Sequence, residues 1–575
     1  METNTSIIEQ AQKKQLRLWP GIVIVFLQWF FRFVFPAVVP EATEIGVLGG
    51  VIGGFALVIW WLFFSRAPRF DRWMAVALMI IALVATKQLL HQSINTAMMG
   101  GMFIFYSIPV LSLAFVVWAV ASRRQSGRLQ RITMVGTILL ASGFWMFLRT
   151  DGMDGEARQD FAWRWAKTAE ERLLEKSNEA LKTTSVDLTA MKTAAEWSGF
   201  RGNNRDGIVQ GVRVKTDWST TPPVQLWRRA VGPGCSSFAM HGHLLFTQEQ
   251  RGEFEMVTCY NRNTGEPVWQ HSDKTRFWDA HAGAGPRSTP TLSNSRVYTL
   301  GATGILNVLN EPDGTVVWSR NVAQDTDVQI PGWGYSSSPL VVDSVVVVAL
   351  AGKILAYNLA NGSQRWTGPD GGESYSSPQL FTIDGARQVV FMNKAGVTSY
   401  APADGKVFWN IPLAGVRIVQ PALITENEIL IDVGDIKGMS RYEIKNGSGG
   451  WRLEERWTSD QLKPNFNDCV VHKGHVYGFE GPMLACAELE KGIRKWKGGR
   501  YGGQLILLAD QDVLLVLSEK GELALVEATA ERFNELARFP AIKGKTWNHP
   551  AMAGDVLVVR NTEEMVAFRL PLASN

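Results

Sequence analysis

Apolar residues are distributed along this chain in two contrasting ways. Before residue 150, long apolar stretches follow one another with short polar links, at residues 18–39, 45–64, 73–90, 100–121 and 132–148. After residue 196, apolar residues come instead in short β-branched runs bounded by Asp, Gly and Asn. The first pattern predicts five helices of membrane-spanning length, and the second predicts a long series of β-strands.

The strand-rich part repeats a unit best seen in YNRNTGEPVW, residues 260–269. Gly265 stands in a turn that suits a positive φ angle, and Trp269 follows four residues later in the next strand. The equivalent aromatic positions are Trp227, Trp269, Trp318, Trp366, Trp409, Trp457, Trp496 and Phe539, spaced 42, 49, 48, 43, 48, 39 and 43 residues apart. This period predicts the four-stranded blades of a β-propeller, with the tryptophans as packing residues that close each blade.

The two ends of the repeat region complement each other. Residues 224–230 carry a closing strand with no inner strands before it, whereas residues 549–570 carry three strands with no closing tryptophan. We therefore expect residues 224–230 to supply the outer strand of the last blade, which closes a ring of eight blades. Seven blades with an unused first strand is the alternative.

Basic residues predict the orientation of the apolar stretches. Lysine and arginine occur in the lead and in the links at residues 65–72 and 122–131, but the links at 40–44 and 91–99 contain none. Because basic residues favour the cytoplasmic side, we expect a cytoplasmic N-terminus over residues 1–17, five spans over 18–149, and everything after Arg149 outside the inner membrane of a bacterium. The first stretch lacks a small-residue cleavage site, so we interpret it as an anchor rather than a signal peptide.

Two charged residues fall inside the apolar stretches, Arg32 in the first and Lys87 in the third. An intramembrane charge is a candidate functional residue, but both side chains could instead extend to the outer headgroups. Residues 150–195 form a charged connector, in which we predict a helix over residues 160–181. Trp163 and Trp165 would contact either the membrane interface or the propeller.

The repeat resembles that of the quinoprotein alcohol dehydrogenases, which bind pyrroloquinoline quinone (PQQ). The non-enzymatic propeller subunit of the outer-membrane β-barrel assembly machinery shares this repeat. The segment WSGFRGNNRDGIVQGVRVKTDW, residues 197–218, is similar to the lead of bacterial membrane-linked PQQ-like propeller proteins. The resemblance covers roughly residues 197–572 of the propeller domain, which we predict over residues 196–575, and it implies the fold. Five spans followed by a propeller also resemble membrane-bound quinoprotein glucose dehydrogenase, in architecture only.

Residues before the first strand of each blade should converge at one mouth of the ring, where ligands bind. The candidates are Trp278, Asp279, His281, Arg287, Trp333, Tyr335, Tyr375, Arg417, Gln420, Asn465, Asn467, Asp468, Tyr501, Lys545, Trp547 and His549. Aromatic rings beside cations and amides suit a planar polar ligand such as PQQ, but also a sugar or a peptide strand. The alternative is that these side chains only line a polar channel.

Charge, cysteines and the spacing of possible metal ligands bear on which functions the sequence favours. The net charge of +4 gives no electrostatic reason to expect nucleic acid, and the four cysteines form no CxxC pair. The enzymes' adjacent-cysteine disulfide has no counterpart, and their calcium ligands match no motif here; Asp279 and Asp468 are the only mouth aspartates to consider. The pairs His472/His475 and His241/His243 each lack a third metal ligand. We predict a membrane-anchored module that binds envelope proteins, peptides or a small ligand, with no firm cofactor; the alternative is a dehydrogenase using PQQ and calcium.

Overall fold

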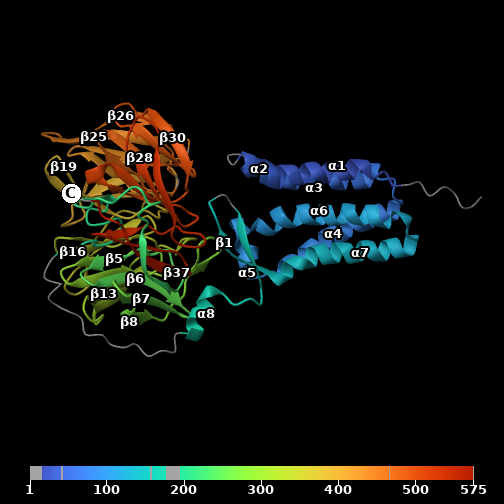
Figure 1. The fold of residues 1–575 in the computed structure, drawn as a ribbon, viewed down its shortest axis with the longest axis horizontal. Coiled ribbons are helices and arrows are strands. Elements are labelled where there is room, and N and C mark those ends of the chain that lie inside the picture. The colour runs from blue at the N-terminus through green and yellow to red at the C-terminus, as the bar shows by residue number, and fades with distance from the viewer. Residues whose placement is uncertain are drawn as a thin grey trace, which may run out of the picture. The chain divides into compact units, whose positions relative to one another are not determined.

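The chain forms two compact units, Met1–Ala166 and Lys167–Asn575. The computed structural model describes residues 16–39, 43–155, 158–176, 194–434, 436–464 and 466–573. The first unit is a bundle of helices with a two-stranded hairpin, and the second is a ring of eight β-sheets (Figure 1). The predicted eight-bladed, all-β propeller is therefore confirmed.

Each of the five apolar stretches contains a helix. In chain order the helices of the first unit are α1 (Trp19–Trp29), η1 (Phe30–Val34), α2 (Phe35–Val38), α3 (Thr43–Ile59), η3 (Trp60–Phe64), α4 (Arg69–Leu89), α5 (Gln92–Thr96), η4 (Met98–Gly100), α6 (Met102–Ala121), η5 (Ser122–Arg124), α7 (Gly127–Gly143) and η6 (Phe144–Phe147). Three described helical stretches are long and apolar enough to cross a membrane, Ile45–Phe64, Arg69–Leu89 and Met102–Arg124, and Trp19–Val34 is apolar but shorter. Five crossings stay a prediction.

The connector differs from the expected continuous helix. The chain leaves η6 directly into a hairpin of β1 (Leu148–Met153) and β2 (Gln159–Trp163), and the helix α8 spans only Ala169–Lys176. Alternating side chains in Gln159–Trp163 suit a strand, in which the Phe161 ring packs against Trp145. Trp163 stacks on Trp165 with ring centroids 5.1 Å apart. The helix prediction was therefore wrong for residues 160–168.

The propeller strands follow the predicted repeat. Blade 1 has β5 (Ala239–His241), β6 (Leu244–Arg251), β7 (Phe254–Asn261) and β8 (Pro267–Asp273); blade 2 has β11 (Thr291–Ser293), β12 (Arg296–Leu300), β13 (Ile305–Asn310) and β14 (Val316–Asn321); blade 3 has β15 (Leu340–Val342), β16 (Val345–Leu350), β17 (Lys353–Asn358) and β18 (Gln364–Thr367); blade 4 has β19 (Gln379–Ile383), β20 (Ala386–Asn393), β21 (Gly396–Tyr400) and β22 (Val407–Pro412).

The remaining blades complete the ring. Blade 5 has β23 (Ala422–Thr425), β24 (Glu428–Gly434), β25 (Gly438–Gly447) and β26 (Gly450–Ser459); blade 6 has β27 (Val470–His472), β28 (His475–Glu480), β29 (Met483–Glu488) and β30 (Arg494–Arg500); blade 7 has β31 (Gln504–Leu508), β32 (Val513–Leu517), β33 (Glu522–Glu527) and β34 (Glu535–Pro540); blade 8 has β35 (Ala551–Ala553), β36 (Val556–Arg560), β37 (Glu564–Arg569) and β4 (Val224–Ala230). Because β4 pairs with β37, the predicted closure by residues 224–230 is confirmed.

The glycine-to-tryptophan repeat joins neighbouring blades. The Trp227 indole on blade 8 donates to the carbonyl of Arg262 in the β7–β8 turn of blade 1, at 2.8 Å. Gly265 in that turn has φ +73°, and a Cβ atom there would lie 2.7 Å from the Trp227 ring. Trp269, Trp318, Trp366, Trp457 and Trp496 likewise donate to a carbonyl of the following blade. The tryptophans are therefore the inter-blade packing residues that the repeat predicts.

Trp409 departs from this arrangement. Its indole donates to Oε1 of Gln388 within its own blade 4, at 2.7 Å. Blade 5 has longer outer strands, β25 and β26, whose connecting turn carries Trp451, and this ring packs on Phe408 of blade 4 at 5.5 Å. The junction between blades 4 and 5 is thus held by a ring pair instead of the repeated indole-to-carbonyl bond.

Candidate functional site

The predicted mouth residues lie in the loops that lead into the first strand of each blade. These first strands neighbour one another around the axis, as β11, β15 and β19 do. Before blade 2 the loop folds into a small hairpin of β9 (Trp278–Asp279) and β10 (Gly283–Ala284). The hairpin brings Asp279 and His281, two of the predicted mouth residues, close to Arg287.

Asp279 is the centre of the first mouth cluster. Its carboxylate pairs with the Arg287 guanidinium and accepts the backbone N–H groups of His281 and Ala282, at 2.7 and 2.9 Å. Burial alone would raise the pKa of Asp279, but the bonds from His281 and the charge of Arg287 outweigh it and lower that pKa to about 2. Asp279 is therefore ionised, and its carboxylate is bonded to groups of its own loop.

A second cluster connects blade 8 to this hairpin. Lys545 Nζ donates to the carbonyl of His281 at 2.7 Å and lies 4.0 Å from the Trp547 ring centre. The Trp547 indole in turn donates to Glu519 Oε1 at 2.5 Å. Burial lowers the pKa of Lys545, although Glu519 and Asp279 act against it. A cation is thus held on an aromatic face at the mouth.

Three rings from different loops form a polar aromatic surface. Trp333 packs on Tyr375 with centroids 4.7 Å apart, and His281 meets the other edge of Trp333 at 6.0 Å. The Tyr375 hydroxyl donates to Glu373 at 2.8 Å. Trp333 is 40% exposed. This surface can stack against a planar group or an extended peptide.

Several other predicted residues connect blades to one another. The Asp468 carboxylate accepts the Gln420 N–H at 2.8 Å and lies 3.4 Å from His549 Nε2. Gln420 Oε1 accepts from Ser377 N, and Asn467 donates to the Gly503 carbonyl. All of these side chains are buried or nearly so. Their bonds give them a structural role beneath the mouth.

Two predicted mouth residues lie elsewhere. Tyr335 and Tyr501 are 1% and 3% exposed and pack in the apolar cores between blades. The Tyr335 hydroxyl donates to the Val328 carbonyl, and that of Tyr501 to Glu535. An aromatic residue before a strand can turn into the blade interface as easily as into the channel, which the sequence pattern does not distinguish. Asn465 lies outside the described residues.

The residues that fill the axis of the ring were not among the predicted site residues. Residues 197–209, here called the plug segment, enter beside blade 1, where Trp197 pairs with Met240. The Ser198 carbonyl accepts from Leu292 N of blade 2, and the Phe200 ring lies 5.0 Å from His549 of blade 8. The segment leaves as β3 (Ile208–Val209), parallel to β31 of blade 7.

Two buried arginines hold the middle of the plug segment. Arg201 donates to the Cys469 carbonyl of blade 6 at 2.6 Å and lies 3.8 Å from Asp468. Arg205 donates to the carbonyls of Ser338 and Pro339 of blade 3, at 3.1 and 2.8 Å. Burial, with help from Arg201, lowers the pKa of Arg205 to about 9. The similarity of this segment to the lead of other PQQ-like propeller proteins marked it as part of the fold. Its position in the channel becomes visible only in the structure.

Two of the histidines considered as metal ligands each pair with a carboxylate. His472 lies 2.6 Å from Asp512, and His241 lies 2.6 Å from Glu311. In the parts of the chain that the structure describes, no group of three or more His, Cys, Asp or Glu side chains is arranged to hold a metal ion. The four cysteines are free thiols.

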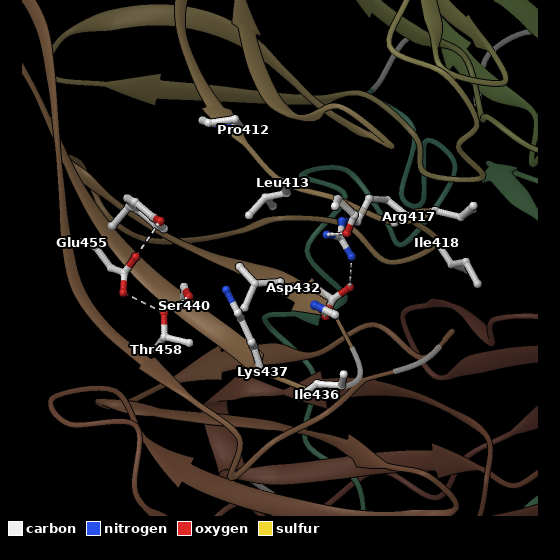
Figure 2. A pocket seen from close by; sticks show the side chains of 16 residues that line it. Pro412, Leu413, Arg417, Ile418, Asp432, Ile436, Lys437, Ser440, Glu455 and Thr458 are labelled. Atoms are coloured by element: carbon white, nitrogen blue, oxygen red, sulfur yellow. Dashed lines mark hydrogen bonds and ion pairs between the residues drawn. The ribbon is translucent and has the colours of Figure 1, made fainter.

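A large open cavity lies at the mouth end of the junction between blades 4 and 5 (Figure 2). Its volume is about 1050 Å³, and it is bounded by the loop at residues 412–418, the β24–β25 turn, and the ends of β25 and β26. Arg417 pairs with Asp432 at 3.5 Å on one side, and Glu455 accepts from Tyr442 and Thr458 on the other. The side chain of Lys437 extends between them (Figure 2).

Part of the repeat region is similar to known proteins. Residues 219–380 match the family model described as "Outer membrane protein assembly factor BamB". The repeat is PQQ-like. Outer membrane protein assembly factor BamB of Yersinia pestis is 29% identical over 195 residues, and that of Shewanella oneidensis is 28% identical over 200 residues. These alignments cover 32% and 33% of this chain, and the chain spans about half the length of the curated relatives it matches, 46% in each case.

Solved structures with similar folds include BamB and a quinoprotein. BamB from Moraxella catarrhalis is 12% identical, covers 61% of this chain and 99% of its own, and has a TM-score of 0.45. Quinohemoprotein alcohol dehydrogenase from Comamonas testosteroni is 11% identical, covers 67% and 82%, and has a TM-score of 0.46.

The mouth does not fit a calcium-bound quinone. A calcium ion binds six to eight oxygen ligands, with carboxylates among carbonyl groups and waters. Asp279 is paired with Arg287, and Asp468 is bonded to Gln420 and faced by His549 and Arg201. Both mouth aspartates are thus satisfied by the chain itself. We derive no catalytic step through PQQ.

Proposed function

We propose that this protein is a membrane-anchored, extracytoplasmic binding or scaffolding module of the cell envelope. Five helical spans in the bacterial inner membrane would leave the N-terminus in the cytoplasm and the PQQ-like propeller outside. The arginine and lysine distribution between the apolar stretches supports this orientation, and the similarity to outer membrane protein assembly factors supports an envelope role.

The mouth face of the propeller is the proposed binding surface. The observation that carries the proposal is the group of large apolar side chains exposed on its loops, among them Trp333 at 40%, Phe466 at 38% and Ile436 at 89%. Exposed apolar side chains rimmed by polar groups are typical of protein-binding surfaces. The plug segment and the ion pairs beneath the mouth connect the loops that carry this surface. Its partners would be envelope proteins or peptides.

Titration of the full-length protein in detergent with PQQ and calcium tests this proposal against a quinoprotein dehydrogenase. The mouth includes Trp278, Trp333 and Trp547, so a planar quinone bound there would quench their fluorescence. We expect no saturable quenching in the micromolar range. Saturable quenching that Arg287→Ala and Trp547→Ala abolish would overturn the proposal and assign the mouth to a cofactor.

A further inference from the structure

We propose that the cavity between blades 4 and 5 binds an extended polypeptide segment that carries an acidic side chain flanked by apolar ones. The inference rests on the proposed function and names the partner's chemistry at one place on the mouth face. Four features of the cavity lead to it: its size, its exposed apolar rim, and, among the described residues, an ammonium group without an ion pair and a stretch of backbone without hydrogen bonds.

The size and the rim indicate a polypeptide. The open groove has a volume of about 1050 Å³, which lies just above the range of about 300–1,000 Å³ that is typical of small-ligand pockets. Leu413, Val416 and Ile418 line one wall, and Ile436 stands opposite with 89% of its surface exposed. Burying such side chains against a partner removes apolar surface from water and so stabilises the complex.

The wall of the cavity also offers main-chain hydrogen bonds. The N–H and C=O groups of Gly415 and Val416 make no hydrogen bond to any residue that the structure describes. Leu413 and Arg417 on either side are tied to blade 4 through Ala395 and Tyr375. The loop is therefore fixed at both ends, with free backbone groups between them. An extended peptide can pair with such groups, as it does when it adds to a sheet edge.

The charged side chains of the cavity indicate which side chain the bound peptide carries. Arg417 and Asp432 neutralise each other at 3.5 Å, and the Glu455 carboxylate is bonded to the hydroxyls of Tyr442 and Thr458. Lys437 makes no ion pair with a described residue, and its side chain extends into the cavity (Figure 2). A carboxylate on the bound segment would pair with this ammonium group.

The junction at which the cavity lies is built differently from most of the others. Trp409 does not bond to blade 5, and the two blades are joined instead through Phe408 and Trp451 on the long β25–β26 hairpin. Six other junctions are tied by an indole that donates to a carbonyl across the junction, and in five of these the indole also lies against a turn glycine. The cavity therefore lies at a junction of different construction.

Selection from a random octapeptide library against the full-length protein in nanodiscs provides the test. We expect enriched sequences with Asp or Glu between apolar residues. A synthetic consensus peptide, followed by fluorescence anisotropy, should bind at least tenfold more weakly to Lys437→Glu, and replacing its acidic residue with Lys should restore binding to that variant. Lys394→Glu, which changes an exposed lysine outside the cavity lining, is the matched control and should bind the consensus normally.

Each other outcome overturns the inference. No enrichment above empty nanodiscs, enrichment of peptides without an acidic residue, or equal weakening by Lys437→Glu and Lys394→Glu would each exclude this site. Cross-linking of a partner from Trp333, which lies on the mouth but outside the cavity lining, would show in those cases that the proposed function survives without it.

Discussion

Gly265 lies directly against the indole of Trp227, and a Cβ atom at this glycine would come within 2.7 Å of the ring. The contact joins the last blade to the first and therefore closes the ring. The position favours glycine for two reasons. Its backbone has a φ angle of +73°, and the Trp227 ring leaves no room for a side chain. The same pairing of a turn glycine with the tryptophan of the preceding blade occurs at Gly314, Gly362, Gly405 and Gly492.

The first prediction separates these two requirements. Gly265→Ala should destabilise the propeller by about 2–4 kcal/mol, because the left-handed backbone costs about 1 kcal/mol and forcing a methyl group against the ring costs about 1–3 more. Gly385→Ala is the matched control, with φ of +76° but open space around the added Cβ, so about 1 kcal/mol is expected. Denaturant unfolding followed by tryptophan fluorescence measures both. Equal losses would refute the steric role of Trp227.

The second prediction concerns the plug segment. Arg205→Ala should lower the free energy of unfolding by about 2 kcal/mol or more, because the carbonyls of Ser338 and Pro339 lose their buried donors. Arg213→Ala removes an exposed arginine with no side-chain bond among the described contacts, and should change stability by less than about 0.5 kcal/mol. If both variants unfold at the same denaturant concentration, the plug segment does not hold the ring together.

The third prediction is a pH dependence from Glu255. This residue is 5% exposed, and burial raises the pKa of its carboxyl to about 7, although the Ala302 N–H bonded to it acts in the opposite direction. Since the folded pKa exceeds the unfolded value, folding favours the protonated form. The stability that this group contributes is present at pH 4.5 and is lost as the pH rises to 7.

Glu255→Gln mimics the protonated form and should remove this dependence. The variant should be more stable than the parent at pH 8, by up to about 3 kcal/mol, and similar to it at pH 4.5. Thermal unfolding of both proteins at the two pH values measures the difference. A variant that is less stable than the parent at pH 8 would show that the ionised carboxylate has a favourable partner.

Much of the fold could be predicted because the repeat has strong local causes. In five of the eight blades a glycine with positive φ lies four residues before the tryptophan of the outer strand, and unmatched strands at the two ends predict the closure by residues 224–230. The connector was mispredicted because charged, alanine-rich residues favour a helix, whereas packing of Phe161 on Trp145 fixes a strand.

The mouth was harder to predict than the fold. Asp279, His281 and Arg287 meet because one loop brings them together, but Tyr335 and Tyr501 turn into the cores between blades. Arg201 and Arg205 reach their partners over sequence separations of more than 100 residues, so only the closed ring shows their role. The cavity beside Lys437 likewise depends on how two whole blades meet.

The fourth prediction tests the orientation in the membrane. Alkaline phosphatase, which is active only outside the cytoplasm, should be active when fused after residue 166 and inactive when fused after residue 125. The second position lies in the arginine-rich link at residues 122–131, which the distribution of basic residues assigns to the cytoplasm. The opposite pattern would place the propeller in the cytoplasm and exclude an extracytoplasmic role.

The most direct test of the account is photo-cross-linking in living cells from the two ends of the propeller. A photoreactive phenylalanine analogue at Trp333 samples the mouth, and one at Ile493, in the turn between β29 and β30, samples the opposite end; the two side chains are 40% and 50% exposed. The account predicts discrete adducts with an envelope protein from Trp333 and none from Ile493. No adduct from Trp333, or the same adducts from both positions, would contradict the assignment of the mouth as the binding surface.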